Sequence, residues 1–343
     1  MDCDEKYDSI QEKLHFLRTA DGFDDPLDGV WDLLGSDIPA DLCDNLGSLH
    51  LPSWLGPKPC PGDHSKINTE SFISFIDSNG CKKMADGADQ FVTDRILPHI
   101  PCMVGIDHSL TGGVFAALSR HYGRQNISLI VIDSHTDVIP MQALSGAIQY
   151  DMEMNPSSVH DANDRFLYNR PDSYNASSFL HTLVAGGQVA PENLYVLGVS
   201  DYPEKKHLRI KDQRIKKYYG AYVGLKRKGA TIVTKKECTL NPAKIAGALK
   251  KIATPYVYVS IDMDIGANNA LDGVRFRNWK GLNTAQIYKL ADSIAHIFSD
   301  SICLAGMDIC EIDPRRAGAL SSSGRDQTYV IAANLIKKLA FDC

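Results

Sequence analysis

The stretch ISLIVIDSHTDVIP, residues 127–140, places three polar side chains directly behind a mostly apolar run. Its first six residues have the β-forming, apolar character of a buried strand. Asp133, His135 and Asp137 follow at alternate positions, and alternate side chains of an extended backbone point the same way. Because burying such groups without partners is costly, the stretch predicts a bound ligand at the end of a strand.

The same rhythm continues from about residue 100 to the C-terminus. Short apolar runs alternate with helical segments such as Gly113–Tyr122, Pro242–Ile252 and Thr284–Phe298. Strands separated by helices of this length form parallel sheets covered on both faces, so the sequence predicts an α/β fold. The expected strands are Cys102–Val104, Ser128–Ile132, Asn193–Val199, Thr231–Val233, Tyr256–Ile261 and Ser301–Ile309.

Polar motifs also follow three other expected strands. MVGIDHS contains His108, YVYVSIDMDIG contains Asp262 and Asp264, and CLAGMDICEIDP contains Glu311. Ligands of parallel sheets bind at the carboxyl ends of the strands, where all these motifs lie. The motif side chains are therefore expected to converge with the cluster at 133–137.

The charge of this set predicts metal ions. Packed aspartates repel one another, and two divalent cations would neutralise four negative charges. A set with two histidines and no cysteine suits Mn²⁺ better than a structural zinc site. Taken singly, each motif could be a solvated loop or a core histidine, but three together at strand ends favour metal binding. The predicted ligands are His108, Asp133, His135, Asp137, Asp262 and Asp264.

The first 95 residues show turn signals among short apolar runs, which predict short helices and loops. PGDHS at 61–65 repeats letters of the first motif, but no apolar strand precedes it, so His64 is expected on a surface loop. We expect a single domain over 1–343, in which residues 1–95 elaborate a core formed by 96–343.

Composition and charge limit the partners. With 36 basic and 42 acidic residues the net charge is −6, which does not favour nucleic acid or anionic lipid. The N-terminus lacks the apolar region of a secretory signal, and no apolar run approaches the roughly 20 residues that cross a bilayer. Nine scattered cysteines without a Cys-x-x-Cys pair indicate reduced thiols, so a soluble, cytoplasmic protein is expected.

GIDHS at 105–109, IDSHTD at 132–137 and SIDMD at 260–264 resemble the three metal motifs of the ureohydrolases, the arginase and agmatinase family. The resemblance extends from about residue 100 to the C-terminus. It implies a three-layer α/β/α fold around a central, mainly parallel sheet of about eight strands. It also implies two Mn²⁺ ions, with Ni²⁺ as the alternative metal, and a homo-oligomer, either a trimer or a hexamer.

The resemblance further implies how the six ligands are divided. His108 and Asp137 bind one ion, and His135 and Asp264 each bind one ion. Asp133 and Asp262 bridge the two ions or are shared between them. The family also has a glutamate near the end of the last strand that holds the substrate guanidinium, and Glu311 takes that place here.

The sequence departs from the family pattern in three places. The family's early Gly-Val-Pro-Phe-Asp stretch is not recognisable in the first hundred residues. Ala267 and Asn268 stand in a rebuilt loop after the third motif. The family's proton-shuttling histidine has no clear counterpart: one alignment gives His181, which we slightly prefer, another gives Asn175, and His160 is a further candidate.

The implied reaction is hydrolysis of a guanidino compound to urea and an amine, with Asp137 passing a proton to the leaving amine. Agmatine, arginine, free guanidine, another guanidino acid and peptide-bound arginine remain open as substrates. Hydrolysis of formiminoglutamate is a related alternative, which Asn175 would favour. Outside this class, a dinuclear phosphoesterase would need basic residues such as Arg315 and Arg316, and a metal-binding homologue without catalysis also remains.

Overall fold

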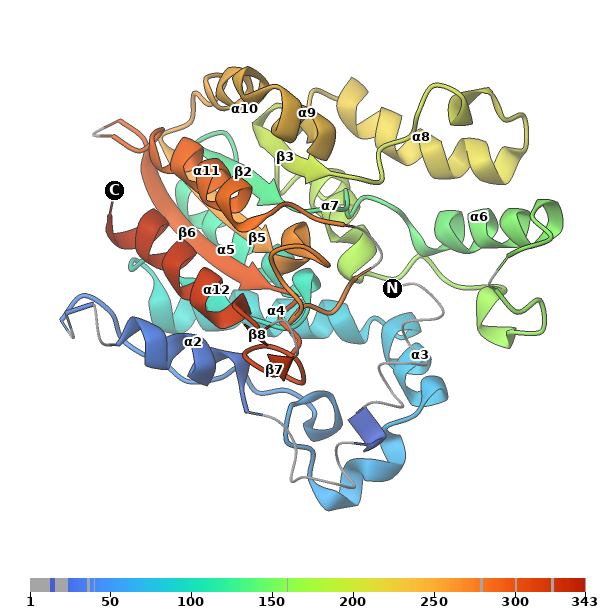
Figure 1. Cartoon of the computed structure of the whole chain (residues 1–343), viewed down its shortest axis with the longest axis horizontal. Coiled ribbons are helices and arrows are strands. Elements are labelled where there is room, and N and C mark those ends of the chain that lie inside the picture. The colour runs from blue at the N-terminus through green and yellow to red at the C-terminus, as the bar shows by residue number, and fades with distance from the viewer. Residues whose placement is uncertain are drawn as a thin grey trace.

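The computed structural model describes residues 13–15, 24–35, 38–39, 41–158, 160–277, 280–299, 301–321 and 324–342. Their central element is a parallel sheet of six strands in the order β1-β6-β5-β2-β3-β4 (Figure 1). All six strands expected from the sequence are present, with ends that differ by at most two residues. The strands are β1 Cys102–Val104, β2 Ile127–Ile132, β3 Leu194–Val199, β4 Thr231–Thr234, β5 Tyr256–Asp262 and β6 Cys303–Cys310.

The α/β class is confirmed, but the described sheet has six strands rather than eight. Two further short strands, β7 Leu320–Ser321 and β8 Gly324–Arg325, pair only with each other, in antiparallel fashion. In the described residues before β1, the regular elements are helices, so this region adds no strand to the edge of the sheet.

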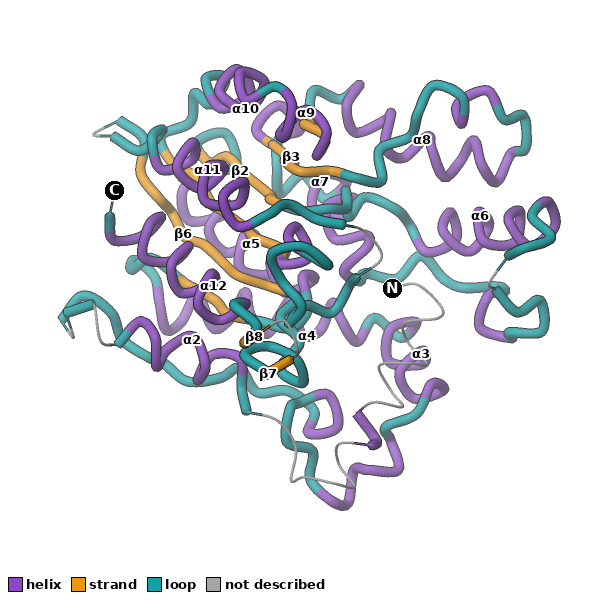
Figure 2. Tube along the Cα trace, in the orientation of Figure 1, coloured by secondary structure: helices purple, strands orange, loops and turns teal. Residues whose placement is uncertain are grey.

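Alternate side chains of the strands face two separate apolar layers. On β2, Ile130 and Ile132 pack into one layer, and Leu129 and Val131 pack into the other. Figure 2 shows the strands as a central layer between helices. Both faces are covered, which explains the unbroken apolar character of the strands.

The first layer contains side chains of α2 Pro26–Leu34, α10 Pro242–Leu249, α11 Thr284–Ala295 and α12 Thr328–Ile336. The second contains side chains of α4 Gly80–Phe91, α5 Thr111–Tyr122, α7 Phe179–Ala185 and α8 Gln213–Arg227. The remaining α-helices are α3 Thr69–Asp77, α6 Met141–Met154 and α9 Lys235–Leu240. In Figure 1, α6 and α8 project together from one end of the sheet, where Arg214 of α8 donates to Glu153 of α6 at 2.6 and 2.7 Å.

The region before β1 consists of short helices and loops, as expected. It includes 3₁₀ turns at Ser53–Leu55 and Pro61–Lys66. His64 lies in the second turn and belongs to neither of the side-chain groups that could bind a metal ion within the described residues. None of the helices in the described part of the chain combines the length and apolar character that a membrane crossing requires.

Candidate metal centre

The carboxyl ends of four strands bring the predicted side chains together. β1 leads to a 3₁₀ turn at His108–Leu110, which Asp107 caps by accepting a hydrogen bond from the Ser109 amide at 3.0 Å. β2 ends immediately before Asp133, β5 ends at Asp262, and β6 ends immediately before Glu311. Parallel pairing aligns these ends at one edge of the sheet, where ligands bind in open α/β folds.

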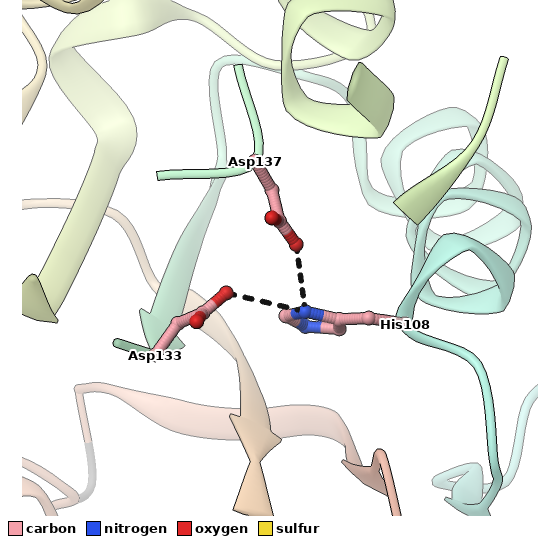
Figure 3. A group of neighbouring side chains, drawn as sticks. All are labelled: His108, Asp133 and Asp137. Atoms are coloured by element: carbon pink, nitrogen blue, oxygen red, sulfur yellow. Dashed lines mark ion pairs between the residues drawn. The ribbon is translucent and has the colours of Figure 1, made fainter. Parts of the chain in front are cut away.

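The first group of side chains surrounds His108. Its Nδ1 lies 3.3 Å from Asp133 Oδ2, 3.0 Å from Asp137 Oδ2 and 3.3 Å from Asp262 Oδ2. Figure 3 shows the carboxylates of Asp133 and Asp137 both directed at the His108 ring. All four side chains are buried. One nitrogen thus faces three carboxylates within a single pocket.

The second group surrounds His135. Its Nδ1 lies 2.8 Å from Asp264 Oδ2 and 3.6 Å from Asp133 Oδ1, so Asp133 belongs to both groups. Backbone amides hold the carboxylates in place: His135 N donates to Asp133 Oδ1 at 2.6 Å, and Asp264 N donates to Asp262 Oδ1 at 2.8 Å. The structure therefore brings all six predicted ligands together.

The donor set fits divalent metal ions. Among the described residues, the buried atoms His108 Nδ1, Asp133 Oδ2 and Asp264 Oδ2 make no hydrogen bond of good geometry and face the ion-pair partners of this cluster, which is a costly arrangement in a protein core. Two subsets have the spacing of a metal site, namely His108 with Asp133 and Asp137, and Asp133 with His135 and Asp264. Cations at these positions would satisfy the orphan atoms and neutralise the carboxylates.

The titration of the cluster reflects this crowding. Burial, followed by repulsion from Asp133, raises the pKa of Asp137 to about 7. Burial and the neighbouring carboxylates of Asp264 and Asp133 raise the pKa of Asp262 well above its usual range. Burial disfavours the charged imidazole of His108, but its carboxylate partners outweigh burial and raise the pKa of His108. Without cations the site therefore binds protons in their place.

A buried hydrogen-bonded chain orients His108. Its Nε2 lies 2.8 Å from the Ser260 hydroxyl, which in turn donates to Asp308 Oδ1 at 2.7 Å. Because Nε2 is bonded to Ser260, Nδ1 is the ring nitrogen directed at the carboxylates. Metal-binding histidines are commonly oriented in this way by a hydrogen bond at the other ring nitrogen. The sequence analysis missed this role of Ser260 and Asp308, although an aspartate within the apolar run of β6 was a detectable signal.

Glu311 lies beside the first group. Its Oε1 accepts a hydrogen bond from His108 N at 2.9 Å, and its Oε2 lies 3.4 Å from the Arg275 guanidinium. Burial raises the pKa of Glu311 to about 7, although Arg275 acts in the opposite direction. The backbone of Glu311 is left-handed, with φ of 61°, as is that of Asp137, with φ of 45°. Strained backbone of this kind concentrates at functional sites.

The three candidates for the proton shuttle have different surroundings. Asn175 is buried, its Oδ1 has no hydrogen-bond partner among the described residues, and it lines the same cavity as Glu311. His181 is exposed on α7, and His160 is half-buried in the loop after α6. This placement favours Asn175 over our slight preference for His181, because a helix-surface side chain is directed at solvent.

Residues 53–341 match the profile of the arginase family. The fold is also similar to a formimidoylglutamase from Bacillus subtilis subsp. subtilis str. 168, at 17% identity over 92% of this chain and 79% of that chain, with a TM-score of 0.55. An arginase from Bacillus caldovelox is 20% identical over 91% of this chain and 88% of that chain, with a TM-score of 0.52. A search of curated proteins found no match.

Proposed function

The chain belongs to the arginase family, and from this premise we propose that it is a metal-dependent hydrolase that cleaves a guanidino compound to urea and an amine. The observation that carries the proposal is the pair of buried histidine and aspartate groups that share Asp133, with the carboxylate of Glu311 beside them. A buried anion next to a carboxylate-rich metal site suits a cationic head group.

We assign His108 and Asp137 to one metal ion, and His135 and Asp264 to contacts with one ion each. Asp133 and Asp262 would be shared between the two ions. The oxygen-rich donor set favours Mn²⁺, and Ni²⁺ is the alternative. When bound, two such cations supply a water molecule whose pKa is lowered toward about 7.

Asp137 then takes the proton of the attacking water and delivers it to the leaving amine. Glu311 fixes the planar head group of the substrate by a charge-assisted pair. Asn175 cannot accept a proton as a histidine would, so it would orient the substrate by hydrogen bonding.

A second candidate reaction is hydrolysis of a formimino compound to formamide and an amine. Asn175 in the buried position beside Glu311 favours it, because this reaction does not require a shuttle histidine. A phosphoesterase is less well supported, because Arg315 is held by Asp313 at 2.7 and 2.8 Å and Arg316 lies 3.6 Å from the same carboxylate.

The test is a panel of guanidino and formimino compounds, incubated with protein loaded with Mn²⁺ or Ni²⁺. Urea release supports the first reaction, and formamide release supports the second. Asp133→Ala serves as the inactive control. If the loaded protein releases neither product but cleaves phosphate esters, the proposal is overturned.

A further inference from the structure

A cavity of about 220 Å³ adjoins Glu311 and Asn175. Its far walls come from the region before β1 and are apolar, with Trp54, Leu55 and Phe75 among them. The rings of Trp54 and Phe75 meet edge to face, with centroids 5.7 Å apart and planes at 88°. The lining of the cavity therefore combines polar residues of the proposed site with apolar, aromatic residues from the region before β1.

The charged side chains that line this cavity already have polar partners. Lys13 donates to the carbonyl oxygens of Trp54 at 2.8 Å and Gly56 at 2.9 Å. Arg275 pairs with Glu311 and with Asp107, in both cases at 3.4 Å.

Arg315 is held by Asp313. Each acidic side chain that lines the cavity thus has a cationic partner within the described residues. With Glu311 holding the head group, the ammonium group at the tail of agmatine or arginine would find only Asp107 and Asp313, which already pair with arginines, whereas an apolar tail needs no such partner.

The volume is sufficient for a ring. An apolar cavity of roughly 150 Å³ holds benzene, so this one accommodates a phenyl-sized group attached to an amidine head. Edge-to-face aromatic walls also stabilise a third ring.

Building on the proposed function, we propose that the substrate is a guanidino or formimino compound whose leaving amine carries an apolar, ring-sized group. The group docks against the walls formed by Trp54 and Phe75 while Glu311 holds the head. The region before β1 thereby sets the substrate class.

The experiment compares kcat/KM for benzylguanidine, methylguanidine and agmatine on the Mn²⁺-loaded protein, with N-benzylformamidine and formamidine as the formimino arm. Burial of a phenyl-sized group predicts a preference of about 10- to 100-fold for the benzyl compounds. Leu55→Trp, which fills the cavity, removes this preference. Leu240→Trp, at a position 73% exposed on α9, is the matched control and retains the preference.

Calorimetric binding of the product amine separates this inference from the proposed function. Benzylamine should bind more tightly than methylamine, and Leu55→Trp should abolish the difference, even if no compound in the panel is cleaved. If agmatine is cleaved as well as benzylguanidine, and benzylamine binds no better than methylamine, the inference is overturned while the proposed reaction stands.

Discussion

Asp133 joins the two histidine groups, because its Oδ2 faces His108 and its Oδ1 faces His135. Asp133→Asn keeps the shape of the side chain but removes its charge, so we expect both metal ions to be lost or greatly weakened. Metal analysis after gel filtration should give two equivalents of Mn²⁺ for the wild type and less than one for the variant. Asp63→Asn, in the PGDHS turn, is the control and should retain both ions. If Asp133→Asn still binds two equivalents of Mn²⁺, Asp133 is not a ligand shared by the two ions.

Glu311 gives the site a pH dependence. Burial raises its pKa to about 7, so the carboxylate is charged above that pH and neutral below it. In the metal-free protein, affinity for agmatine should therefore fall about tenfold per pH unit as pH drops below about 7. Isothermal titration calorimetry between pH 5 and 8 would measure this. Glu311→Gln should bind weakly at every pH, and an unchanged slope in that variant would assign the titration to another group.

That the six proposed ligands lie close together could be predicted from the sequence because two simple rules suffice. Alternate residues of an extended segment share a side, and parallel strands end at one edge. Arg275 could not be predicted in the same way: it lies in an irregular loop, and its approach to Glu311 depends on tertiary packing. The choice between His181 and Asn175 could not be made from the sequence, since an insertion shifts the alignment and only the fold shows which side chain is buried.

At the level of elements, the register of β5 against β6 places Ser260 beside Asp308 and within reach of His108. Ser260 and Asp308 are direct partners across these strands, and from there Ser260 reaches His108. Ser260→Ala breaks this chain, and loss of such a partner typically lowers metal affinity 10- to 100-fold, by roughly 1.4–2.8 kcal/mol. Titration with Mn²⁺ would measure it.

The control for this substitution is Ser128→Ala on β2. Ser128 is equally buried, and its hydroxyl hydrogen-bonds to Thr254 Oγ1 at 2.7 Å, at the opposite end of the strand. Both variants remove one buried hydroxyl, so similar losses of stability are expected. If the two also bind Mn²⁺ alike, the chain through Ser260 does not orient His108.

The contact between α4 and α5 depends on a glycine. A Cβ on Gly113 would lie 1.9 Å from the Ala85 carbonyl oxygen, so the two helices could not keep their distance. We expect Gly113→Ala to lower the free energy of unfolding by about 1–3 kcal/mol. Gly87→Ala, on the exposed side of α4 with nothing within 4 Å, should instead raise it by up to about 1 kcal/mol. Urea denaturation of both variants would show whether the signs differ.

For the whole molecule, the central sheet was predictable and its surroundings were not. Strands buried on both faces are continuous apolar runs, which stand out in any sequence. The short helices before β1 lack such a signal, and yet Trp54 and Phe75 in that region form the walls of the cavity beside Glu311. The proposed chemistry of the head group therefore rests on motifs, whereas the shape of the cavity required the fold.

Metal binding should also stabilise the molecule as a whole. Without cations, buried aspartates from β2 and β5 repel one another at the edge of the sheet, so folding is opposed by charge. A cation that binds only the folded state adds about 2.7 kcal/mol at a concentration 100-fold above its Kd, which corresponds to several degrees in Tm. Calorimetry should show a higher Tm with Mn²⁺ than after chelation, and the rise should disappear in Asp133→Asn. If the Mn²⁺-loaded protein, the chelated protein and Asp133→Asn all have the same Tm, protons alone suffice to hold these carboxylates together. The interpretation of the cluster as a metal centre would then fail.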